Sequence, residues 1–165
     1  MAATPGSATG RPAPVEIIRF RPRHLARILE IERAAFAEGP YTRAVFLDLY
    51  SQCGELFLVA KLLGRIAGYI ATCAGDGGAE IISLAVDPEH RKKGIAAALL
   101  EYTLERLRVF GVRLVELMVR VDNEEAIRFY RRFGFRRVQE VPGYYENGRA
   151  GLRMRRTVAG ELRRL

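Results

Sequence analysis

The spacing of apolar and polar residues changes several times along this chain of 165 residues, and each change marks the start of an expected helix or strand. Short apolar runs predict strands over residues 15–20, 56–63, 65–73 and 80–86, with the second and third joined in a hairpin about Gly64. Apolar residues at helical spacing predict a helix over residues 24–35. Thr42 is suited to cap a second helix.

The second half of the chain continues the alternation. Leucines at 100, 104 and 107 predict a helix between Gly94 and Gly111, and Asn123 opens another that runs to Arg132. Further strands are predicted over residues 114–120, 135–141 and 150–156. The order of strand, two helices, three strands, helix, strand, helix and two strands predicts an α/β (α+β) fold, a mixed sheet with helices on its faces.

Length and composition indicate one domain. The chain is 49% hydrophobic, enough for one buried core at this length, and we place the domain at residues 15–156. Residues 1–14 are rich in Ala, Pro, Gly, Ser and Thr and are expected to form a flexible leader, while residues 157–165 form a basic tail. With no membrane-spanning run or secretory signal, a cytoplasmic protein is expected.

Charge and cysteine content narrow the expected partners. The chain holds 27 Lys and Arg residues against 19 Asp and Glu residues, a formal net charge of +8, which favours phosphorylated or polyanionic ligands. Cys53 and Cys73 stand alone in sequence and are expected to be buried and reduced. His24 and His90 lack acidic partners at ligand spacing, so no metal is expected, and His90 is expected to border a phosphate site.

A basic turn links the strand at 80–86 to the helix that follows. Its residues are Arg91, Lys92, Lys93, Gly94, Ile95 and Ala96. The first amides of a helix have no partner within the helix, and the helix dipole adds positive charge there, so the turn is suited to hold a pyrophosphate. It is no nucleotide-triphosphate loop, since no Gly-Lys-Ser/Thr is present, and no dinucleotide fingerprint, since Gly-x-Gly-x-x-Gly is missing.

The turn and its neighbours resemble the GNAT acyl-CoA-dependent N-acetyltransferases over residues 15–156. Leu84, Ala85 and Val86, followed by the basic turn, resemble the family's acetyl-CoA segment, in which strand amides pair with the pantetheine arm and turn amides hold the pyrophosphate. Asn123 and Tyr130 resemble its second CoA segment. The resemblance implies a mixed, mostly antiparallel sheet of about seven strands with about four helices, acetyl-CoA as co-substrate and no metal.

Within that superfamily the chain is similar to the RimI-type (ribosomal-protein-alanine) and archaeal protein N-terminal acetyltransferases. The segment from Val119 to Asn123 and the later Phe-Gly-Phe at 133–135 carry this similarity. The resemblance places Tyr144 and Tyr145 beside the first residues of the substrate, with Tyr41 on the opposing loop. It implies a protein N-terminus, such as that of a ribosomal protein, as acceptor, and a monomer or weak dimer that acts without membrane or nucleic acid.

The chemistry requires a proton acceptor for the ammonium and a proton donor for the departing thiolate. The resemblance gives the donor role to Tyr130, whose phenol stays protonated at neutral pH; simple packing between Phe129 and Phe133 is the alternative. RimI-type enzymes carry Glu where this chain has Met118, and a thioether accepts no proton at neutral pH. The role of base is therefore open.

Glu80 is the preferred replacement and Glu116 the weaker one. Strand alternation places Glu80 with Ile82 and Leu84, an apolar setting that would raise the pKa of its carboxyl, with a bridging water to the amine. A solvated strand end is the alternative for Glu80.

Other functions remain open at this point. The acceptor could instead be a lysine side chain or a small amine, or the chain could be a CoA-binding regulator without turnover. Arginines near the predicted final strands and the C-terminus could contact RNA or an acidic protein, or form a solvated face: Arg131, Arg132, Arg136, Arg137, Arg153, Arg155, Arg156, Arg163 and Arg164.

Overall fold

The elements of the computed structural model, which describes residues 13–158, follow the predicted order. The strands are β1 (Val15–Arg19), β2 (Phe57–Leu62), β3 (Arg65–Gly75), β4 (Gly78–Val86), β5 (Leu114–Arg120), β6 (Arg136–Val141) and β7 (Gly151–Thr157). The helices are α1 (Leu25–Ala35), α2 (Arg43–Cys53), α3 (Ile95–Val109) and α4 (Glu124–Arg132). Most of the expected leader and tail, residues 1–12 and 159–165, lies outside the described residues.

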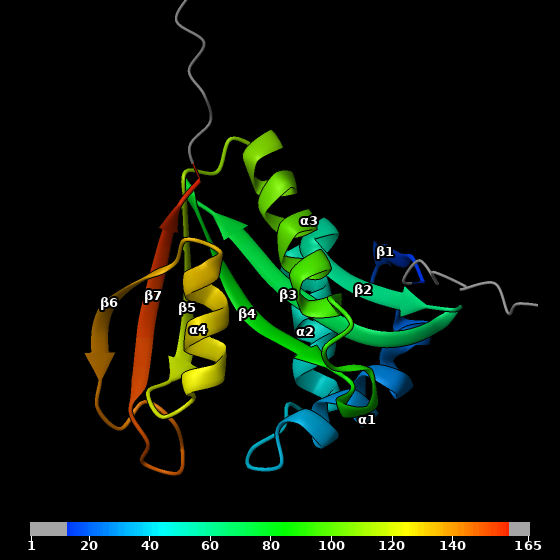
Figure 1. The fold of residues 1–165 in the computed structure, drawn as a ribbon, viewed down its shortest axis with the longest axis horizontal. Helices are drawn as coiled ribbons and strands as arrows, with labels where there is room; N and C mark the ends of the chain where they lie inside the picture. Colours follow the sequence, from blue (N-terminus) through cyan, green and yellow to red (C-terminus); the bar gives the residue numbers. More distant parts are fainter. Residues whose placement is uncertain (1–12, 159–165) are drawn as a thin grey trace, which may run out of the picture.

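The seven strands form one sheet in the order β1-β2-β3-β4-β5-β7-β6 (Figure 1). Neighbouring strands are antiparallel except β4 and β5, which run parallel. A parallel pair needs a crossover connection, and α3 supplies it. The predicted mixed, mostly antiparallel sheet with helices on its faces is confirmed.

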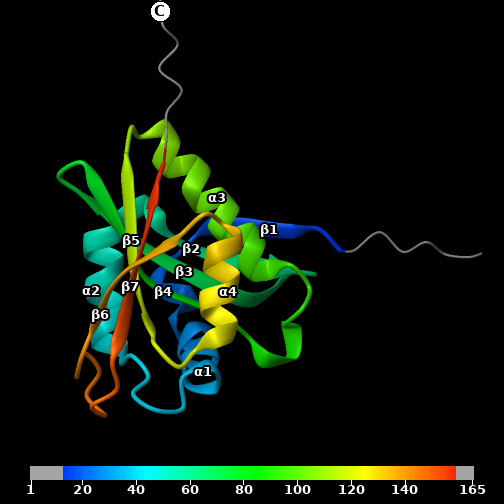
Figure 2. The ribbon, with the colours of Figure 1, turned by 60° about the vertical axis from the view of Figure 1, so that its left-hand side comes forward.

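Helices cover both faces of the sheet, α3 and α4 on one and α1 and α2 on the other (Figures 1 and 2). Leu99 of α3, Val115 of β5 and Met154 of β7 belong to the core of the α3/α4 face. Ile28 of α1 and Phe46 of α2 belong to the core of the α1/α2 face. In the described part of the chain, no helix is both long and apolar enough to cross a membrane.

The parallel strands β4 and β5 separate part-way along their length. They pair from Gly78 with Leu114 to Ile81 with Leu117, although β4 continues to Val86 and β5 to Arg120. Figure 1 shows the two strands diverging towards their C-terminal ends. The backbone of residues 82–86 therefore forms an edge beside the opening, with unpaired groups available to a ligand.

A bulge in β4 decides which side chains face each helix pair. Opposite β3 the register moves from Ile81 directly to Ser83, so Ile82 is the extra residue. Ile82 packs with the core of the α1/α2 face and Leu84 with the core of the α3/α4 face. The prediction that Leu84 shares a side with Ile82 and Glu80 was wrong, because the bulge shifts the alternation by one residue.

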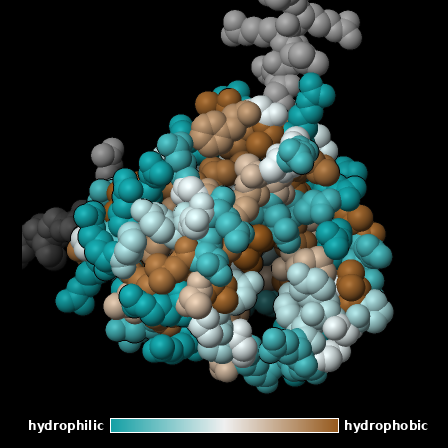
Figure 3. Space-filling model, turned by 180° about the vertical axis from the view of Figure 1, so that it is seen from behind, coloured by the Kyte–Doolittle hydropathy of each residue, from teal (hydrophilic) through white to brown (hydrophobic). Residues whose placement is uncertain are grey.

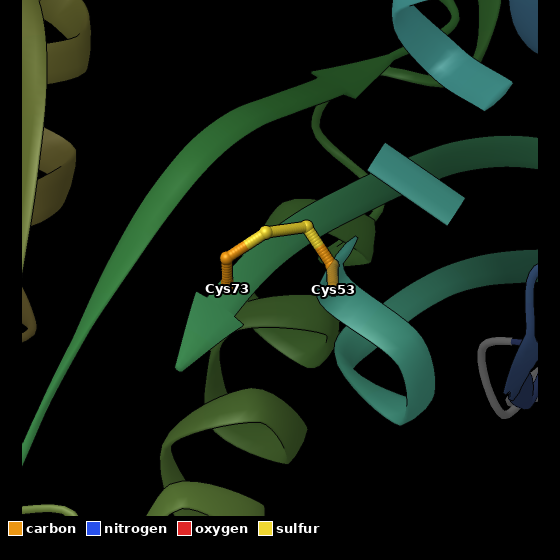
Figure 4. The surroundings of a disulfide bond; sticks show 2 residues. All are labelled: Cys53 and Cys73. Atoms are coloured by element: carbon orange, nitrogen blue, oxygen red, sulfur yellow. A yellow bond between two sulfur atoms is a disulfide. The ribbon is translucent and has the colours of Figure 1, made fainter. Parts of the chain in front are cut away.

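Cys53 and Cys73 form a disulfide that joins the end of α2 to β3 (Figure 4). The prediction of two reduced thiols was wrong. The cysteines are 20 residues apart in sequence, and the packing of α2 across β3 brings them together. Neither thiol has a neighbouring cysteine in sequence, so the pairing could be found only from the tertiary structure. The bond ties α2 to the strand next to β4.

Candidate active site

The basic turn between β4 and α3 exposes a series of backbone amides. Lys92 and Gly94 take positive φ values of 61° and 77°, and Gly94 is the N-cap residue of α3. Within the described residues, the amides of residues 92–97 donate no hydrogen bond, and the first helical bond into the turn is Ala98 N–H to the Gly94 carbonyl at 3.0 Å. Such consecutive amides at a helix N-terminus form a concave anion site.

Asp87 holds this turn against α1. Its carboxylate accepts the amide N–H of Glu89 at 3.2 Å, forms an ion pair with Arg27 of α1 and lies 3.3 Å from Nδ1 of His90. The Glu89 amide and the Arg27 guanidinium lower the pKa of Asp87 despite its burial. The carboxylate therefore stays charged and fixes the approach to the turn, while Arg91, Lys92 and Lys93 stay exposed.

The second predicted CoA segment begins at Asn123, the N-cap residue of α4. Its side-chain oxygen accepts the amide N–H of Ala126 at 3.1 Å. In Figure 1 the N-terminal ends of α3 and α4 lie towards the same end of the molecule, where β4 and β5 have separated. Both helix dipoles thus place positive potential at the opening.

Tyr130 lies on α4 with its ring against the sheet. It is 8% exposed, and its ring centroid lies 5.2 Å from that of Phe129 and 5.6 Å from that of Phe135. Burial, with a smaller contribution from Tyr145, raises the pKa of the Tyr130 hydroxyl. The phenol therefore remains protonated at neutral pH, as a proton donor requires. The packing expected as the alternative for Tyr130 is present, in its contacts with Phe129 and Phe135.

Two loops meet on the α1/α2 face, and we call them the acceptor loops: residues 36–42 between α1 and α2, and residues 142–150 between β6 and β7. Asn147 Nδ2 donates to the Glu38 carboxylate at 3.1 Å and joins them. Both loops lie at the lower end of the molecule in Figure 1, and Figure 3 shows the surface hollowed there when seen from behind. Residues 109 positions apart therefore close one wall of a depression.

The tyrosines of the acceptor loops form one cluster. The rings of Tyr144 and Tyr145 pack edge to face at a centroid distance of 5.0 Å. Burial raises the pKa of Tyr145 to about 12, and the nearby Tyr144 and Tyr41 add to this rise. Burial also raises the pKa of Tyr41, with further contributions from Glu32, Tyr144 and Glu80. Groups that influence each other's pKa lie close together, so the three predicted substrate-binding tyrosines and Glu80 occupy one region.

A buried carboxylate, that of Glu32, binds groups next to this region. It is 2% exposed on α1, and its two oxygens accept the Tyr41 amide N–H at 2.9 Å and the hydroxyl of Tyr69 on β3. The Tyr69 hydroxyl also lies 2.8 Å from Oγ of Ser83 on β4. Burial raises the pKa of Glu32. A chain of hydrogen bonds thus links an acceptor loop to the strand edge at the opening.

Sequence profiles place this arrangement in a known family. The profile of the Acetyltransferase (GNAT) family matches residues 25–135. The chain belongs to the GNAT acetyltransferase family. It is 40% identical over 140 residues to an uncharacterized N-acetyltransferase of Methanocaldococcus jannaschii, covering 84% of this chain and 88% of that protein. The predicted enzyme class, an N-acetyltransferase, is confirmed.

Two further GNAT relatives match the predicted subgroup. An N-alpha-acetyltransferase of Sulfolobus acidocaldarius is 31% identical over 135 residues, covering 74% of this chain and 80% of that one. The crystal structure of the ribosomal-protein-S18-alanine N-acetyltransferase of Escherichia coli superimposes with a TM-score of 0.80 at 27% identity, covering 90% of this chain and 98% of that one. The predicted resemblance to RimI-type enzymes is confirmed.

The candidate bases of this GNAT chain differ in their surroundings. Glu80 is exposed at the start of β4, so the apolar setting expected for it was wrong, although it faces the region of Tyr41. Glu116 of β5 forms ion pairs with Arg153 at 3.1 Å and Arg155 at 2.6 Å. The hydrogen bond from Arg155, followed by that from Arg153, lowers the pKa of Glu116, which makes it a poor base.

Met118 packs inside the site rather than away from it. A Cβ built on Gly151 would lie 2.6 Å from the Met118 methyl carbon and 3.0 Å from the Tyr144 ring, so a side chain there would require both to shift. The side chain beside Tyr144 is therefore apolar at the position where the resemblance to RimI-type enzymes leads one to expect Glu.

Sequence analysis missed Glu32, although a signal for it was present. The buried stripe of α1 includes Leu25 and Ile28, and Glu32 follows Ile28 by four residues on the same face. A carboxylate on an apolar helix face needs partners, and Tyr41 and Tyr69 supply them. His24 lies away from this region, where it is buried and accepts the Arg21 amide N–H at 3.0 Å, whereas His90 lies beside Asp87 at the approach to the basic turn.

Proposed function

We propose that this protein acetylates the α-amine of a protein N-terminus in the cytoplasm, taking the acetyl group from acetyl-CoA by direct transfer. One observation carries the proposal. The opening between β4 and β5 has the free amides of residues 92–97 on the side of α3 and the tyrosine cluster of the acceptor loops on the side of α1 and α2. Such an opening lets a donor and an amine approach each other from opposite faces of the sheet.

The residues of the α3/α4 face suit the CoA part of the donor. The amides of residues 92–97 would hold the pyrophosphate, and the exposed cations Arg91, Lys92 and Lys93 would add attraction. The free edge of β4, formed by Leu84, Ala85 and Val86, would pair with the amide groups of the pantetheine arm. Asn123 would border the same ligand from the start of α4.

Tyr130 would protonate the thiolate that leaves after transfer. When bound, acetyl-CoA supplies the acetyl thioester and therefore the group that is transferred. Tyr130 lies on α4 among the core residues of the α3/α4 face, and the nearby Tyr145 adds to the rise in its pKa. Because its pKa is raised, the hydroxyl stays protonated at neutral pH and would donate its proton to the thiolate as that group leaves. No covalent enzyme intermediate is needed.

Glu80 would take the proton of the ammonium through a bridging water. Glu80 is exposed, and its charge contributes to the raised pKa of Tyr41. It lies opposite Glu116 of β5, one residue before the pairing of β4 and β5 ends. Glu116 is held by two arginines, so it is the weaker candidate. Glu32 would act as a positioning residue, because it fixes the Tyr41 amide and the Tyr69 hydroxyl.

The acceptor loops favour a peptide terminus over a freely diffusing small amine. Asn147 and Glu38 join the loops, and Arg149 pairs with Asp122 at 2.5 Å to hold the second loop to the end of β5. Tyr41, Tyr144 and Tyr145 lie close together on these loops and would contact the first residues of a chain. Relatives named for N-alpha-acetyltransferase activity and for alanine of ribosomal protein S18 support the same acceptor class, including a ribosomal protein.

Mass spectrometry of acetylated products tests this function. Purified protein is incubated with acetyl-CoA and with three acceptors: a peptide library that varies the first two residues, lysine peptides with blocked N-termini, and small amines. We expect acetylation at the α-amine of a subset of the library. Products only on lysine or on small amines would change the acceptor class. Binding of acetyl-CoA without any product would make the protein a CoA-binding regulator.

A further inference from the structure

A groove lined by arginines lies away from the proposed active site. The C-terminal end of α4, the start of β6 and the end of β7 form it, and Glu101 of α3 is its one acidic lining residue. Five of its lining residues are arginines: Arg132, Arg136, Arg137, Arg155 and Arg156. The proposed donor site lies at the N-terminal end of α4, and this helix of nine residues separates the two by about 13 Å. Figure 1 shows the N-terminal end of α4 at the bottom of the helix, near the opening between β4 and β5, and its C-terminal end at the top.

Most of these guanidinium groups have no acidic partner. Among the described residues, Arg132, Arg136 and Arg137 form no ion pair. Arg155 pairs with Glu116 at 2.6 Å, and Arg156 donates to the carbonyl oxygen of Phe133 at 2.6 Å. The groove is therefore a surplus of positive charge rather than a network of surface ion pairs.

The strand register places like charges against each other. Arg136 of β6 lies directly opposite Arg155 of β7 on the face of the sheet that carries Glu116, and Arg137 lies opposite Met154, diagonal to Arg156, on the face covered by α3 and α4. Like charges directly opposite across antiparallel strands destabilise a sheet. Glu116 accounts for Arg155, and a helix C-terminus attracts cations and so accounts for Arg132, but neither accounts for Arg136 or Arg137. An anion that bridges the two strands would relieve this repulsion.

The lining favours phosphate over the carboxylates of a protein partner. Protein interfaces depend on buried aromatic and aliphatic anchors, and here Phe133 and Val138 are the only apolar residues of the lining. Every cation in the groove is arginine, whose planar fork matches the oxygens of phosphate and of carboxylate, so the scarcity of apolar anchors is what favours phosphate. The arginines lie on both faces of the sheet edge formed by β6 and β7, so a polymer of phosphates that runs past this edge would reach several of them.

We propose that this arginine groove binds the phosphodiester backbone of a nucleic acid without base specificity. Contacts of this kind position a protein on a nucleic acid and carry no sequence information. The function is separate from acetyl transfer, because no groove arginine belongs to the proposed donor or acceptor site. The full chain would therefore bind nucleic acid and acetylate a peptide independently.

Fluorescence anisotropy with short labelled oligonucleotides tests the proposal. A single-stranded RNA and a DNA of equal length and sequence are titrated with the full chain at several salt concentrations. The test variant is R136E/R137E; the control variant R33E/R65E makes the same change in net charge at exposed positions on α1 and at the start of β3. We expect R136E/R137E to weaken binding by at least about tenfold and to lower the salt slope by about 1.4 for the single strand, with peptide acetylation unchanged.

Each outcome is decisive. Equal losses in both variants would show attraction by net charge alone and overturn the groove as the site. Equal affinity for RNA and DNA supports backbone recognition, and binding of RNA alone supports it with an added contact to the 2′-hydroxyl. If polyglutamate binds the wild-type chain as tightly as RNA does, and R136E/R137E abolishes that binding, the partner is an acidic protein and the proposal is wrong.

Discussion

The two sides of the opening between β4 and β5 differ in composition, since backbone groups form one and side chains form the other. On the α3/α4 face, contiguous backbone forms the anion site: the amides of residues 92–97 and the edge of β4. On the α1/α2 face, side chains from distant segments form the site, as in the bond between Glu38 and Asn147. The backbone side depends on a few conformational requirements, whereas the side-chain side depends on tertiary contacts that each contribute a small amount.

This difference predicts how the two sides respond to substitution. A change on the backbone side should act on the donor alone, because the turn contacts no acceptor loop. A change on the side-chain side should act on the acceptor, and its effect should be spread over several residues. Tyr130 belongs to α4 on the first side, and Tyr145 of the second side contributes to the rise in its pKa. Tyr130 should therefore affect the transfer step rather than either binding step.

The largest effect is expected for Tyr130→Phe. Phenylalanine keeps the ring packing with Phe129 and Phe135 but removes the proton donor. We expect kcat to fall by about 100-fold or more, with the affinity for acetyl-CoA within about twofold of wild type. Steady-state kinetics and calorimetric titration measure the two quantities. Tyr102→Phe on the exposed surface of α3 is the matched control; unchanged kcat in Tyr130→Phe would remove this residue as the acid.

The next largest effect is expected for Gly94→Val, which tests the backbone side. Gly94 has a φ of 77°, and a Cβ there would meet nothing within 4 Å, so the cost is conformational rather than steric. Strain of about 1–3 kcal/mol at a β-branched residue should move the turn and weaken acetyl-CoA binding by about tenfold or more. Gly111→Val, at a φ of 76° just after α3, imposes similar strain elsewhere. Equal loss of affinity in both variants would contradict a role of the turn in binding.

The two sides also differ in how far the sequence predicted them. The basic turn, Gly94 and Asn123 form within short segments, so spacing and capping chemistry identify them without tertiary knowledge. The element order fixed the sheet, because strands and helices of this length and order have few arrangements. The bulge at Ile82 was not predicted, since it depends on pairing with β3.

The side-chain features needed the tertiary structure. The disulfide of Cys53 and Cys73 depends on where α2 crosses β3, and the exposure of Glu80 depends on what covers the end of β4. Glu32 could be predicted as a notable residue from its position on an apolar helix face, but its partners Tyr41 and Tyr69 could not be predicted. Local patterns therefore predict backbone sites better than sites assembled from several segments.

Glu80→Gln tests the base and should have an intermediate effect. The substitution keeps the size of the side chain and removes its ability to accept a proton, so we expect kcat to fall by about tenfold at neutral pH, with water as the residual acceptor. Glu16→Gln, at an exposed position of β1, is the control. A full-rate Glu80→Gln enzyme would direct attention to Glu116 or bulk water.

Glu32 gives a smaller effect whose sign depends on pH. Burial raises the pKa of Glu32 above its ordinary value of 4.5, so the folded protein keeps this proton to higher pH than the unfolded chain does. The free energy of unfolding should therefore fall as pH rises from 4.5 through the folded pKa. Glu32→Gln does not ionise and should lack this fall, with the two proteins within about 1 kcal/mol of each other at the acidic end.

Urea unfolding of both proteins across this pH range measures the difference. Glu30→Gln, on the exposed side of the same helix, is the control and should follow the wild type. A constant difference between wild type and Glu32→Gln at all pH values would show that Glu32 does not titrate in this range. The positioning role predicts in addition a higher KM for peptide in Glu32→Gln, because the Tyr41 amide would lose part of its anchor.

The smallest effect is expected for Asn147→Ala, which removes the bond between the acceptor loops. This hydrogen bond joins a neutral amide to a carboxylate and is exposed to solvent, so its loss should lower the free energy of unfolding by about 1 kcal/mol or less. The KM for peptide should rise by about two- to fivefold. The affinity for acetyl-CoA should not change, because the donor contacts lie on the other face. Glu38→Ala also removes the ion pair with Arg120 at 3.9 Å, and Asn147→Ala also removes the acceptor of the Arg149 amide N–H. The shared bond should therefore make the effect of the double variant smaller than the sum of the two single effects. Additive effects in the double variant would mean that each residue contacts the peptide separately and that the loops are not held together by this bond.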